Sequence, residues 1–460
     1  MSASTRFQTY DPGQLRLLPE DMSQWLPEDH LVYFLLDLVD TLDLHELFAF
    51  YDDGSRGGRP PYHPKMLLSL LLYAYCTGEP SSRKIEKATY ERVPYRILAG
   101  DQHPDHATIS SFRKDHLPAL GRLFGQVLAL CMKAGLVKLG HVSLDGTKIK
   151  ANASKHKAMT YGRMQKKADE LEAEVKRLLN EAEKTDAAED AAYGVEKRGD
   201  ELPDELRFKD SRLKKIQEAK KALEDEARAL AAEEQVEYEA KVEARKKRGN
   251  SGRPPKPPSE EPEPDPKSQR SFTDPDSRIM PVGGKNFEQA YNCQAAVDDK
   301  SQIIVAADVT QSTVDKQQVE PMVEQIKTNT GEKPKKISAD TGYFSEDNVE
   351  TLVKEEIDAY IATGKRKHDE PPPPCPKGRI PNSATVKDRM ERKLRTVKGR
   401  ATYTLRKQIV EPVFGQIKAV RGFNQFSLRG YENVTNEWCL VCSCHNILKL
   451  FRSGCNLALA

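Results

Sequence analysis

Apolar residues recur at the spacing of helices in the part of the chain before residue 137. One apolar run begins with Pro64, a residue suited to the first turn of a helix, and Pro118 marks a break between two later helices. We predict helices over residues 30–44, 64–77 and 83–95, a cap at residues 80–82, and two more helices within residues 105–136. The pattern therefore predicts an all-helical N-terminal domain over residues 1–136.

The last two of these predicted helices have the arrangement of a helix-turn-helix DNA reader. In that interpretation Ser110, Ser111, Arg113 and Lys114 face a groove of the DNA. The same segment is equally well explained as part of a packing domain. The sequence leaves both interpretations open, and DNA binding by this domain is a hypothesis.

From Met164 the chain becomes highly charged, and its apolar residues repeat every seven positions. The repeats are Met164, Leu171 and Leu178, then Ala168, Val175 and Ala182, and later Ile216, Leu223 and Leu230. They predict two amphipathic helices that form an antiparallel hairpin. The Pro-rich and charge-rich stretch 245–270 cannot bury a core and predicts a disordered linker. Together these features predict an insertion over residues 158–284, a helical arm whose two ends return close together.

Strand signals lie on both sides of this insertion. The apolar run that begins at residue 142 ends on Asp145. After the insertion we predict strands over 291–297, 303–309, 336–340 and 357–363, helices over 315–328 and 345–355, and a hairpin turn at 298–300. This alternation is typical of an α/β sheet. We predict that residues 137–157 and 285–432 form this domain and that residues 433–460 form a C-terminal helix.

Two of the predicted strands end on an aspartate that small residues follow. Asp145 precedes Gly146 in VSLDG, and Asp340 precedes Thr341 and Gly342 in ISADTG. Small residues let a ligand approach the backbone, and ligands of open α/β sheets bind at the carboxyl ends of the strands. The matched pair of acids therefore predicts a functional site at that edge of the sheet.

A third acid, Glu411, lies in the segment 403–423. On a helix it would share one face with Lys407, Phe414 and Lys418. A separate buried stripe would consist of Ile409, Val413, Ile417 and Val420. Because the residue before a proline avoids the α region, Pro412 predicts a kink or a restart of the helix there.

Composition and charge restrict the class of protein. A chain of 460 residues exceeds the size of most single cores, so two or three structural units are expected. No run of about 18 apolar residues and no signal-peptide core is present, which predicts an intracellular, cytoplasmic protein. The net charge is only +2, but the segment 377–460 holds 16 Lys and Arg against five Asp and Glu. That basic segment favours a nucleic-acid partner over a merely solvated surface.

Four potential metal ligands lie together near the C-terminus, namely Cys439, Cys442, Cys444 and His445. The run that contains them is apolar at helical spacing, and no second CxxC pair completes a tetrahedral zinc site. We therefore favour a buried helix over a metal site for this run.

Several blocks, in order, resemble the DDE transposases of bacterial insertion sequences, with an InsH-type N-terminal domain. HPKMLLSLLLYAYCTG and DHATISSFRKDH resemble the N-terminal domain, and TDPDSRIM and YNCQAAVD resemble the middle of the family's sequence. DGTKIKANASK, SADTGYFS and RKQIVEPVFGQIKAVRGF resemble the three catalytic blocks. The resemblance implies an α/β ribonuclease H-like core, a mixed sheet with helices on both faces, and carries the catalytic roles onto Asp145, Asp340 and Glu411.

One departure from the family pattern is visible. Relatives often show Tyr, two residues, Arg, three residues, Glu, six residues and Lys. The spacing of Glu411 and Lys418 fits that pattern, but Lys407 stands at the Arg position and Tyr403 lies one residue too far upstream. The resemblance therefore assigns no role to Tyr403.

The resemblance also implies a reaction, cofactors and partners. The protein would cut and join the ends of an insertion sequence by phosphodiester hydrolysis and strand transfer, with two Mg²⁺ or Mn²⁺ ions held by Asp145, Asp340 and Glu411. Its partner would be double-stranded DNA, both the terminal inverted repeats and the target, and it would act as a homodimer in the DNA complex. We expect DNA contacts from Lys148, Lys150, Arg392, Lys393, Arg395, Arg406, Lys407, Lys418 and Arg421.

Two other classes of protein were weighed against this hypothesis. A tyrosine recombinase with Tyr403 as nucleophile needs an HxxR pair, and none of the ten histidines has Arg three residues later. A non-catalytic DNA-binding protein derived from a transposase remains the alternative. The presence of all three acids favours the enzyme.

Overall fold

The computed structural model describes residues 21–51, 61–154, 158–193, 204–247, 254, 256–257, 262–283, 286–364 and 373–455. Its contacts divide the chain into two compact units. Unit 1 comprises residues 1–137, 415–422 and 440–460, and unit 2 comprises residues 138–414 and 423–439. Two C-terminal segments therefore belong with the N-terminal unit, although they were predicted to belong to the catalytic domain and to a separate helix.

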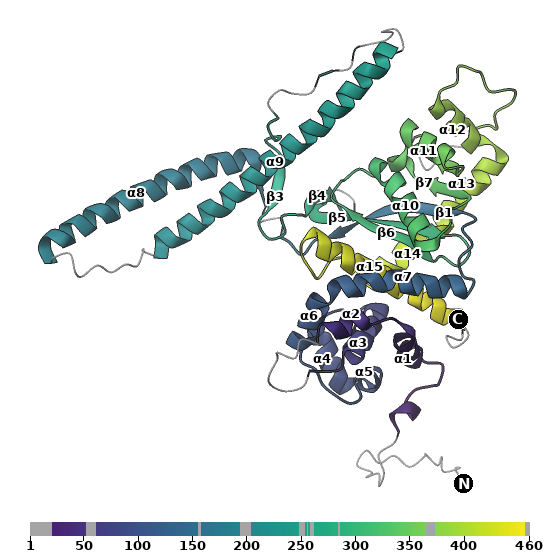
Figure 1. Cartoon of the computed structure of the whole chain (residues 1–460), viewed down its shortest axis with the longest axis horizontal. Coiled ribbons are helices and arrows are strands. Elements are labelled where there is room, and N and C mark those ends of the chain that lie inside the picture. Colours follow the sequence, from purple (N-terminus) through teal and green to yellow (C-terminus); the bar gives the residue numbers. More distant parts are fainter. Residues whose placement is uncertain are drawn as a thin grey trace, which may run out of the picture. The chain divides into compact units, whose positions relative to one another are not determined.

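The elements described in the N-terminal part of unit 1 are helices (Figure 1). They are η1 (Met22–Gln24), α1 (Leu31–Thr41), α2 (His45–Ala49), α3 (Pro64–Thr77), α4 (Ser82–Glu91), α5 (Val93–Leu98), α6 (His106–Asp115) and α7 (Leu117–Lys133). The single helix predicted over 83–95 is two helices, because Pro94 cannot continue α4 and Arg92 is extended. The predicted break near Pro118 lies at His116, between α6 and α7.

The cysteine-rich run lies on α15 (Tyr431–Arg452), whose last part belongs to unit 1. There Cys444 is buried, and its Sγ lies 3.9 Å from the carbonyl oxygen of Leu72 in α3. The Sγ of Cys76 in turn lies 3.7 Å from the carbonyl oxygen of Cys444. These thiols donate weak hydrogen bonds to the helix backbone and fill core space in the way that small apolar side chains do.

A mixed six-stranded sheet forms the centre of unit 2. Its strands are β1 (Val142–Lys150), β4 (Arg278–Pro281), β5 (Phe287–Asp298), β6 (Ile304–Thr310), β7 (Lys336–Ala339) and β8 (Asp358–Ile361). The order is β4-β5-β1-β7-β8, with β6 also paired to β5. Strand β5 runs antiparallel to β1, β4 and β6, whereas β7 and β8 continue the sheet parallel to β1.

Helices surround this sheet, as the alternating pattern predicted (Figure 1). They are α10 (Val319–Thr330), α11 (Glu346–Lys354), α12 (Val386–Arg395), α13 (Val397–Ile409) and α14 (Glu411–Gly415), with short turns η3 (Lys316–Gln318) and η4 (Thr341–Tyr343). A short π-helical turn, η5 (Gln416–Val420), follows α14 and belongs to unit 1. Helix α10 packs on β6 and β5, and α13 packs against β1, β7 and β8. The strands and helices predicted after residue 285 are therefore confirmed, whereas β4 was not predicted.

Asp298 has a structural role that the sequence did not indicate. It was assigned to an exposed hairpin turn, but it is the last residue of β5 and is fully buried. Its carboxylate accepts hydrogen bonds from the backbone N–H groups of Leu139 (2.7 Å), Lys138 (3.3 Å) and Lys300 (3.0 Å). Asp298 thus ties the entry of β1 to the β5–β6 turn, and Asp299 beside it is the exposed acid of that turn.

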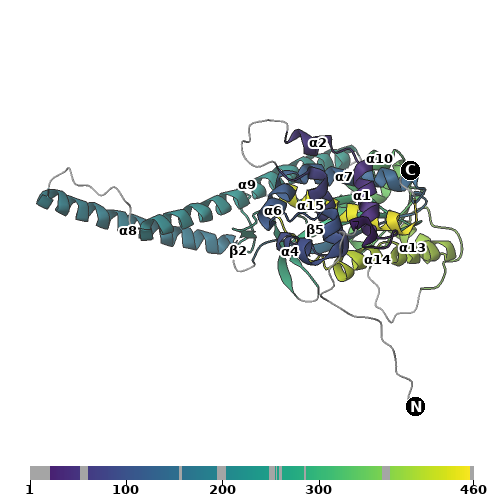
Figure 2. The same ribbon diagram turned by 90° about the horizontal axis from the view of Figure 1, so that it is seen from below.

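The insertion forms an arm that a small two-stranded sheet closes at its base. Strand β2 (Ala158–Thr160) pairs antiparallel with β3 (Gln269–Ser271), and helices α8 (Tyr161–Tyr193) and α9 (Asp204–Lys247) run between them. Figures 1 and 2 show the two helices side by side along the arm. Hydrogen bonds from Tyr161 to Glu224 and from Lys209 to Glu174 show that they are antiparallel.

Part of the predicted apolar repeat holds this arm together. A buried cluster joins the two helices and consists of Tyr161, Met164, Ala168, Leu171, Leu213, Ile216, Ala219 and Leu223, with Val175 packed against it. Leu230 continues the predicted repeat but is 60% exposed, because the contacts of α9 with α8 end before it. The side chains of Leu178 and Ala182 lie outside the described residues, as does much of the predicted linker. The last two residues of that linker, Gln269 and Arg270, lie in β3 and are therefore ordered.

Ile216 and Leu230 provide a matched test of the arm. Replacing Ile216 with Asp would bury an unpaired charge among Met164 and Leu171, so we expect the arm to lose about 3 kcal/mol or more of stability. Leu230→Asp on the same helix should change stability by less than about 0.5 kcal/mol. Circular dichroism during thermal unfolding should show an early loss of helix in Ile216→Asp alone. An early loss in Leu230→Asp as well would show that the second half of α9 is packed.

Candidate active site

Two strands bring Asp145 and Asp340 to the same level of the sheet. β1 and β7 are parallel neighbours in which Val142 pairs with Ile337 and Ser143 with Ser338. Continuing that register places Asp145 level with Asp340, which directly follows β7. Asp340 Oδ1 accepts a hydrogen bond from the N–H of Gly342 at 2.8 Å and so begins the turn η4. The register is consistent with the prediction that these two acids lie at one level of the sheet. The prediction that the first strand ends on Asp145 is wrong, because β1 stays paired with β5 up to Lys150.

Glu411 is the first residue of α14, a short helix that follows α13 after one intervening residue, Val410. The interruption lies where Pro412 predicted it. Arg406, in the last turn of α13, donates hydrogen bonds to Asp145 Oδ2 at 3.0 Å and to Glu411 Oε1 at 3.3 Å. One guanidinium group therefore bridges two of the three predicted acids.

Burial controls the electrostatics of this group. The Asp145 side chain is only 19% exposed, and burial raises its pKa to about 6, although Arg406 opposes that shift and Asp340 adds to it. Burial by itself would lower the pKa of Arg406, but the neighbouring Asp145, Tyr403, Glu411 and Asp340 raise it above its usual value. The charge of Arg406 thus lies among all three predicted acids.

Arg406 lies beside the acids in the position that the sequence analysis assigned to Lys407, and Tyr403 lies close to Arg406. Lys407 was predicted to face the site beside Glu411, but it is exposed, and Arg406 makes both ion pairs. Tyr403 lies one helical turn before Arg406, and burial, Arg406 and Asp340 all affect the pKa of its hydroxyl, which is raised overall. Four residues separate Arg406 from Glu411, one more than in the family pattern. Because the helix breaks at Val410, Arg406 and Tyr403 still lie close to the acids.

Asp315 is a further acid of this site that sequence reasoning missed. It precedes η3 and accepts hydrogen bonds on Oδ1 from Asn292 Nδ2 (2.7 Å) and Gln294 Nε2 (2.9 Å). Lys148 Nζ lies 3.5 Å from the same oxygen. In the sequence Asp315 resembled an ordinary acid at the start of a helix, and only the β5 side chains that bind it could have pointed to it.

Gly146 and Gly342 leave room for Asp315. A Cβ on Gly146 would stand 3.0 Å from Asp315 Oδ1 and 2.6 Å from Gln294 Nε2. A Cβ on Gly342 would stand 3.1 Å from Asp315 Oδ2 and 3.0 Å from Asp340 Oδ1. The small residues after each strand, which we interpreted as space for a ligand, therefore also accommodate a carboxylate of the protein.

Comparison with known families gives two matches. Residues 20–115 match the model described as Transposase domain (DUF772), and residues 267–447 match the model described as Transposase DDE domain. The chain belongs to the DDE transposases. The comparisons with curated proteins and with solved structures return no match.

The matched DDE segment of this transposase contains Asp340 and Glu411 but begins after Asp145. The insertion separates Asp145 from the matched segment in sequence, and the pairing of β1 with β5 and β7 returns it to the sheet. The sheet thus places Asp145 level with Asp340, although Asp145 lies outside the matched segment. No helix among the described residues is long and apolar enough to span a membrane.

The donor atoms around Asp145 suit a hard divalent cation, since they are carboxylate oxygens. The raised pKa of Asp145 shows that the protein alone does not fully compensate its negative charge. Within the described ranges no three Asp, Glu, His or Cys side chains form a ready-made cage, and Arg406 lies between Asp145 and Glu411. The oxygen donors thus suit a divalent metal by their chemistry, although the described residues are not arranged as a metal site.

Several cations that were expected to contact DNA are engaged within the protein. Arg392 donates to the carbonyl oxygens of Lys377 and Gly378, and Arg395 pairs with Glu391. Arg421 is only 7% exposed and donates to the carbonyl oxygen of Val441 within unit 1, so the structure contradicts its assignment to a DNA surface. Lys150 is 44% exposed in its side chain and lies 3.8 Å from Glu288, and Lys418 is half-buried.

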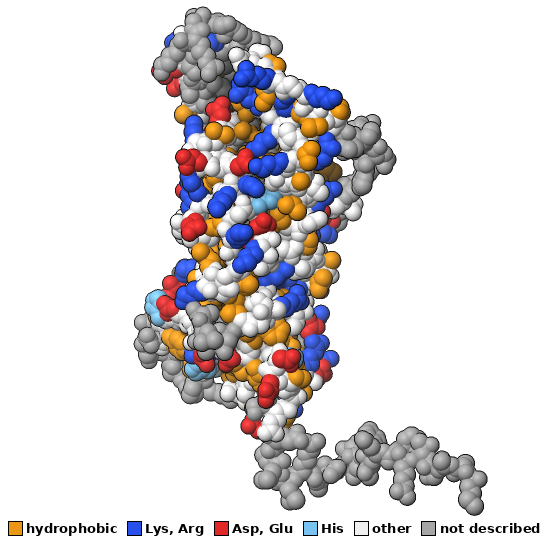
Figure 3. Space-filling model, turned by 90° about the vertical axis from the view of Figure 1, so that its right-hand side faces the viewer, with side chains coloured by type: hydrophobic (Ala, Val, Ile, Leu, Met, Phe, Trp, Pro, Cys, Tyr) orange, Lys and Arg blue, Asp and Glu red, His pale blue; other side chains and the backbone are white. Residues whose placement is uncertain are grey.

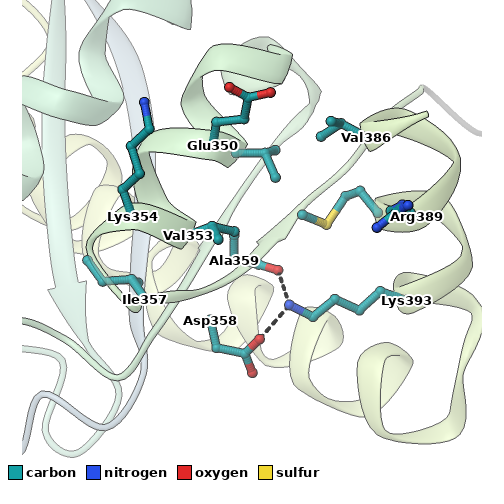
Figure 4. Close-up of a pocket in the computed structure, with 11 residues that line it drawn as sticks. Glu350, Val353, Lys354, Ile357, Asp358, Ala359, Val386, Arg389 and Lys393 are labelled. Atoms are coloured by element: carbon teal, nitrogen blue, oxygen red, sulfur yellow. Dashed lines mark hydrogen bonds and ion pairs between the residues drawn. The ribbon is translucent and has the colours of Figure 1, made fainter. Parts of the chain in front are cut away.

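Lys393 lies at a pocket rather than at the acids (Figure 4). Its ammonium group binds Asp358 and the carbonyl oxygen of Ala359, and stands 4.2 Å from the ring centre of Tyr360. The pocket has a volume of about 530 Å³ and lies between α11, β8 and α12. Because Lys393 ties α12 to β8, its first role is structural.

Two further sequence expectations, both for residues of unit 1, need correction. In the helix-turn-helix interpretation Arg113 would face a DNA groove, but it is buried and donates to the carbonyl oxygen of Pro80 at 2.8 Å, which agrees with the packing interpretation for this residue. Ser110, Ser111 and Lys114 are exposed on the same helix. Val420, which was predicted to belong to the buried stripe, is 78% exposed, because the backbone changes to a π-helical turn over 416–420 and rotates the later side chains.

The raised pKa of Asp145 predicts a pH-dependent stability in chelator. A folded pKa of about 6 against an ordinary value of 3.8 means that ionisation of Asp145 opposes folding, increasingly as the pH rises between these values. Asp145→Asn should therefore be about 3 kcal/mol more stable than the parent at pH 7, and most of the gain should be lost near pH 4. Urea unfolding at several pH values measures this difference. Asp299→Asn, at an exposed acid, should show no such gain, and an equal gain there would point to a general charge effect.

Proposed function

We propose that this transposase cuts and joins the ends of an insertion sequence by metal-dependent phosphodiester hydrolysis and strand transfer, on a ribonuclease H-like core. Asp145, Asp340 and Glu411 are the proposed metal-binding and catalytic residues. The proposed partners are the terminal inverted repeats and a target DNA, bound by a homodimer. The observation that carries the proposal is a mostly buried carboxylate on the central strand β1, Asp145, held by an arginine that also holds Glu411.

The arrangement of the sheet supports the ribonuclease H-like assignment. A long antiparallel unit of β1, β5 and β6 precedes two parallel strands, β7 and β8. Helix α10 connects β6 to β7, and α11 connects β7 to β8. Asp340 lies where the parallel strand β7 ends, the position at which open α/β sheets bind ligands, and Asp145 lies level with it inside β1. The third acid, Glu411, comes from helix α14, which follows the last strand, β8, in the chain.

When bound, two divalent ions would supply a charged nucleophile and stabilise the leaving oxygen of a phosphodiester. The residues of the chain have separate tasks. Asp145 presents an oxygen from inside strand β1, Asp340 presents one from the residue that follows β7, and Glu411, 49% exposed, presents one from a helix start. Arg406 holds Asp145 and Glu411 in place when no ion is bound, and it is a candidate phosphate contact when an ion replaces it.

A basic surface near α12 and α13 supports a polyanionic partner. Figure 3 shows Lys and Arg side chains spread over this face of the molecule, with fewer acidic ones among them. The exposed cations of these two helices and of the loop before them are Lys377, Arg379, Lys387, Arg389, Lys398 and Lys407. Lys407 was expected from the sequence to contact DNA and remains a proposed DNA contact. The other exposed cations of this surface replace Arg392, Lys393 and Arg395 as proposed contacts.

The proposed reaction predicts a separation of chemistry from binding. Asp145→Asn, Asp340→Asn and Glu411→Gln should each abolish strand cleavage in Mg²⁺, while DNA affinity in chelator stays equal or rises, because each removes a negative charge near the DNA. Cleavage of DNA that carries the element's ends and a mobility-shift titration measure the two properties. Asp299→Asn is the matched control, since Asp298 is structural, and it should cleave within a few-fold of the parent. Full cleavage by any of the three variants would remove that residue from the site.

The basic surface predicts a change in the salt dependence of binding. Replacing Lys387, Lys398 and Lys407 together with Gln should weaken binding to all DNA sequences alike and flatten the salt slope by about 0.9 for each lost phosphate contact. Lys333→Gln is a suitable control, because Lys333 precedes β7 at the edge of the sheet opposite to Asp340. A loss confined to the element's own ends would instead assign these lysines to base readout.

The alternative, a non-catalytic DNA-binding protein derived from a transposase, gives a different result in the same assays. It predicts DNA binding by the parent without cleavage in Mg²⁺ or Mn²⁺. It also predicts that the three acid variants differ from the parent only in affinity.

A further inference from the structure

We propose that Asp315 is a fourth carboxylate of the active site and binds a divalent metal ion through Oδ2, beside Asp340. This inference rests on the metal-dependent function proposed above and adds a ligand to it. Asp315 comes from the loop between β6 and α10, an element that contributes none of the three acids already assigned.

The two oxygens of Asp315 have different surroundings. Oδ1 accepts hydrogen bonds from Asn292 and Gln294 of β5 and also lies 3.5 Å from the ammonium group of Lys148. These donors fix the plane of the carboxylate. Oδ2 makes none of these contacts and lies beside Gly342, where a Cβ would be 3.1 Å from it and 3.0 Å from Asp340 Oδ1. One oxygen of Asp315 and one of Asp340 thus face the same small space.

A buried acceptor beside this carboxylate points independently to a ligand. Asn292 is fully buried, and among the described residues its Oδ1 has no hydrogen-bond partner. Its amide nitrogen donates both to Ser312 O (3.1 Å) and to Asp315, which fixes the orientation of the amide. Asn292 Oδ1 and Asp315 Oδ1 each lie 3.0 Å from the Cβ position of Gly146. A water molecule on a bound cation would supply the donor that Asn292 lacks.

The balance of charge also favours a cation here. Within the described part of the chain, the ion pairs to Asp145, Asp315, Asp340 and Glu411 come from two cations, Arg406 and Lys148. Four carboxylates against two cations leave two negative charges, the charge that one divalent ion neutralises. The hydroxyl of Tyr343, which donates to Gln294, lies within the electrostatic influence of Asp315, Asp145 and Asp340. The acids therefore form one electrostatic group.

The test is a calorimetric titration of the full chain with Mn²⁺ in the absence of DNA. Asp315→Asn keeps an oxygen that can accept from Asn292 and Gln294 but places an amide nitrogen at the Oδ2 position, so we expect at least tenfold weaker binding or the loss of one site. Glu320→Gln removes the same charge from an exposed position on α10 and should bind within twofold of the parent. Binding by Asp315→Asn within twofold of the parent would overturn the inference.

A second variant keeps the test decisive if Asp315→Asn does not fold. Gly146→Ala retains every charge but places a methyl group against Asp315 Oδ1 and Gln294, away from Asp340, and should also weaken Mn²⁺ binding. Unchanged binding by Gly146→Ala would overturn the inference in that case. Lost binding in Asp145→Asn with retained binding in Asp315→Asn would reject the fourth ligand alone. A parent protein that binds no Mn²⁺ would reject the metal-dependent function as well.

Discussion

The pairing of β1 with two partners is the constraint on which the active site depends. β1 joins β5 over nine residue pairs on one side and β7 on the other, although more than a hundred residues of insertion follow it in the chain. The β7 register sets the height of Asp145 beside Asp340, and the β5 register sets Gly146 opposite Gln294 and Lys148 opposite Asn292. A slip of one residue in β1 would turn Asp145 to the opposite face and remove Lys148 from Asp315.

The second principle of the site is an excess of buried negative charge. Asp145 ionises with difficulty because burial removes water from it, and Arg406 compensates only part of that cost. Such a group opposes folding and is retained for what it binds. Arg406 is the counter-ion of Asp145 and Glu411, and Lys148 is that of Asp315.

The sequence predicted the parts of this site that follow local rules. Asp145 and Asp340 each end an apolar run, and the spacing around Glu411 is helical, so a sheet edge with three acids was foreseeable. The orientation of Arg406 toward the acids could not be predicted, because it depends on the break of the helix at Val410. Asp315 and Asp298 were also missed, since both are short acids near turns, and only non-local partners on β5 and before β1 distinguish them. The burial of Arg421 could not be predicted either, because its segment, residues 415–422, belongs to unit 1 and not to the unit that contains the sheet.

The small β2–β3 ladder at the base of the arm has a consequence for how the chain folds. Closing a loop costs entropy that grows with its length, and β1 must find β5 across the whole insertion. Helices α8 and α9 make their contacts locally, and the ladder then brings residues 158 and 271 together, so the arm shortens the loop that separates β1 from β4. The arm is thus expected to form early and to lower the contact order of a sheet whose strands are far apart in the sequence. Insertions or deletions at its far end would leave the register of β1 unchanged, which makes the arm a place where the length of the chain can vary while the acids stay in position.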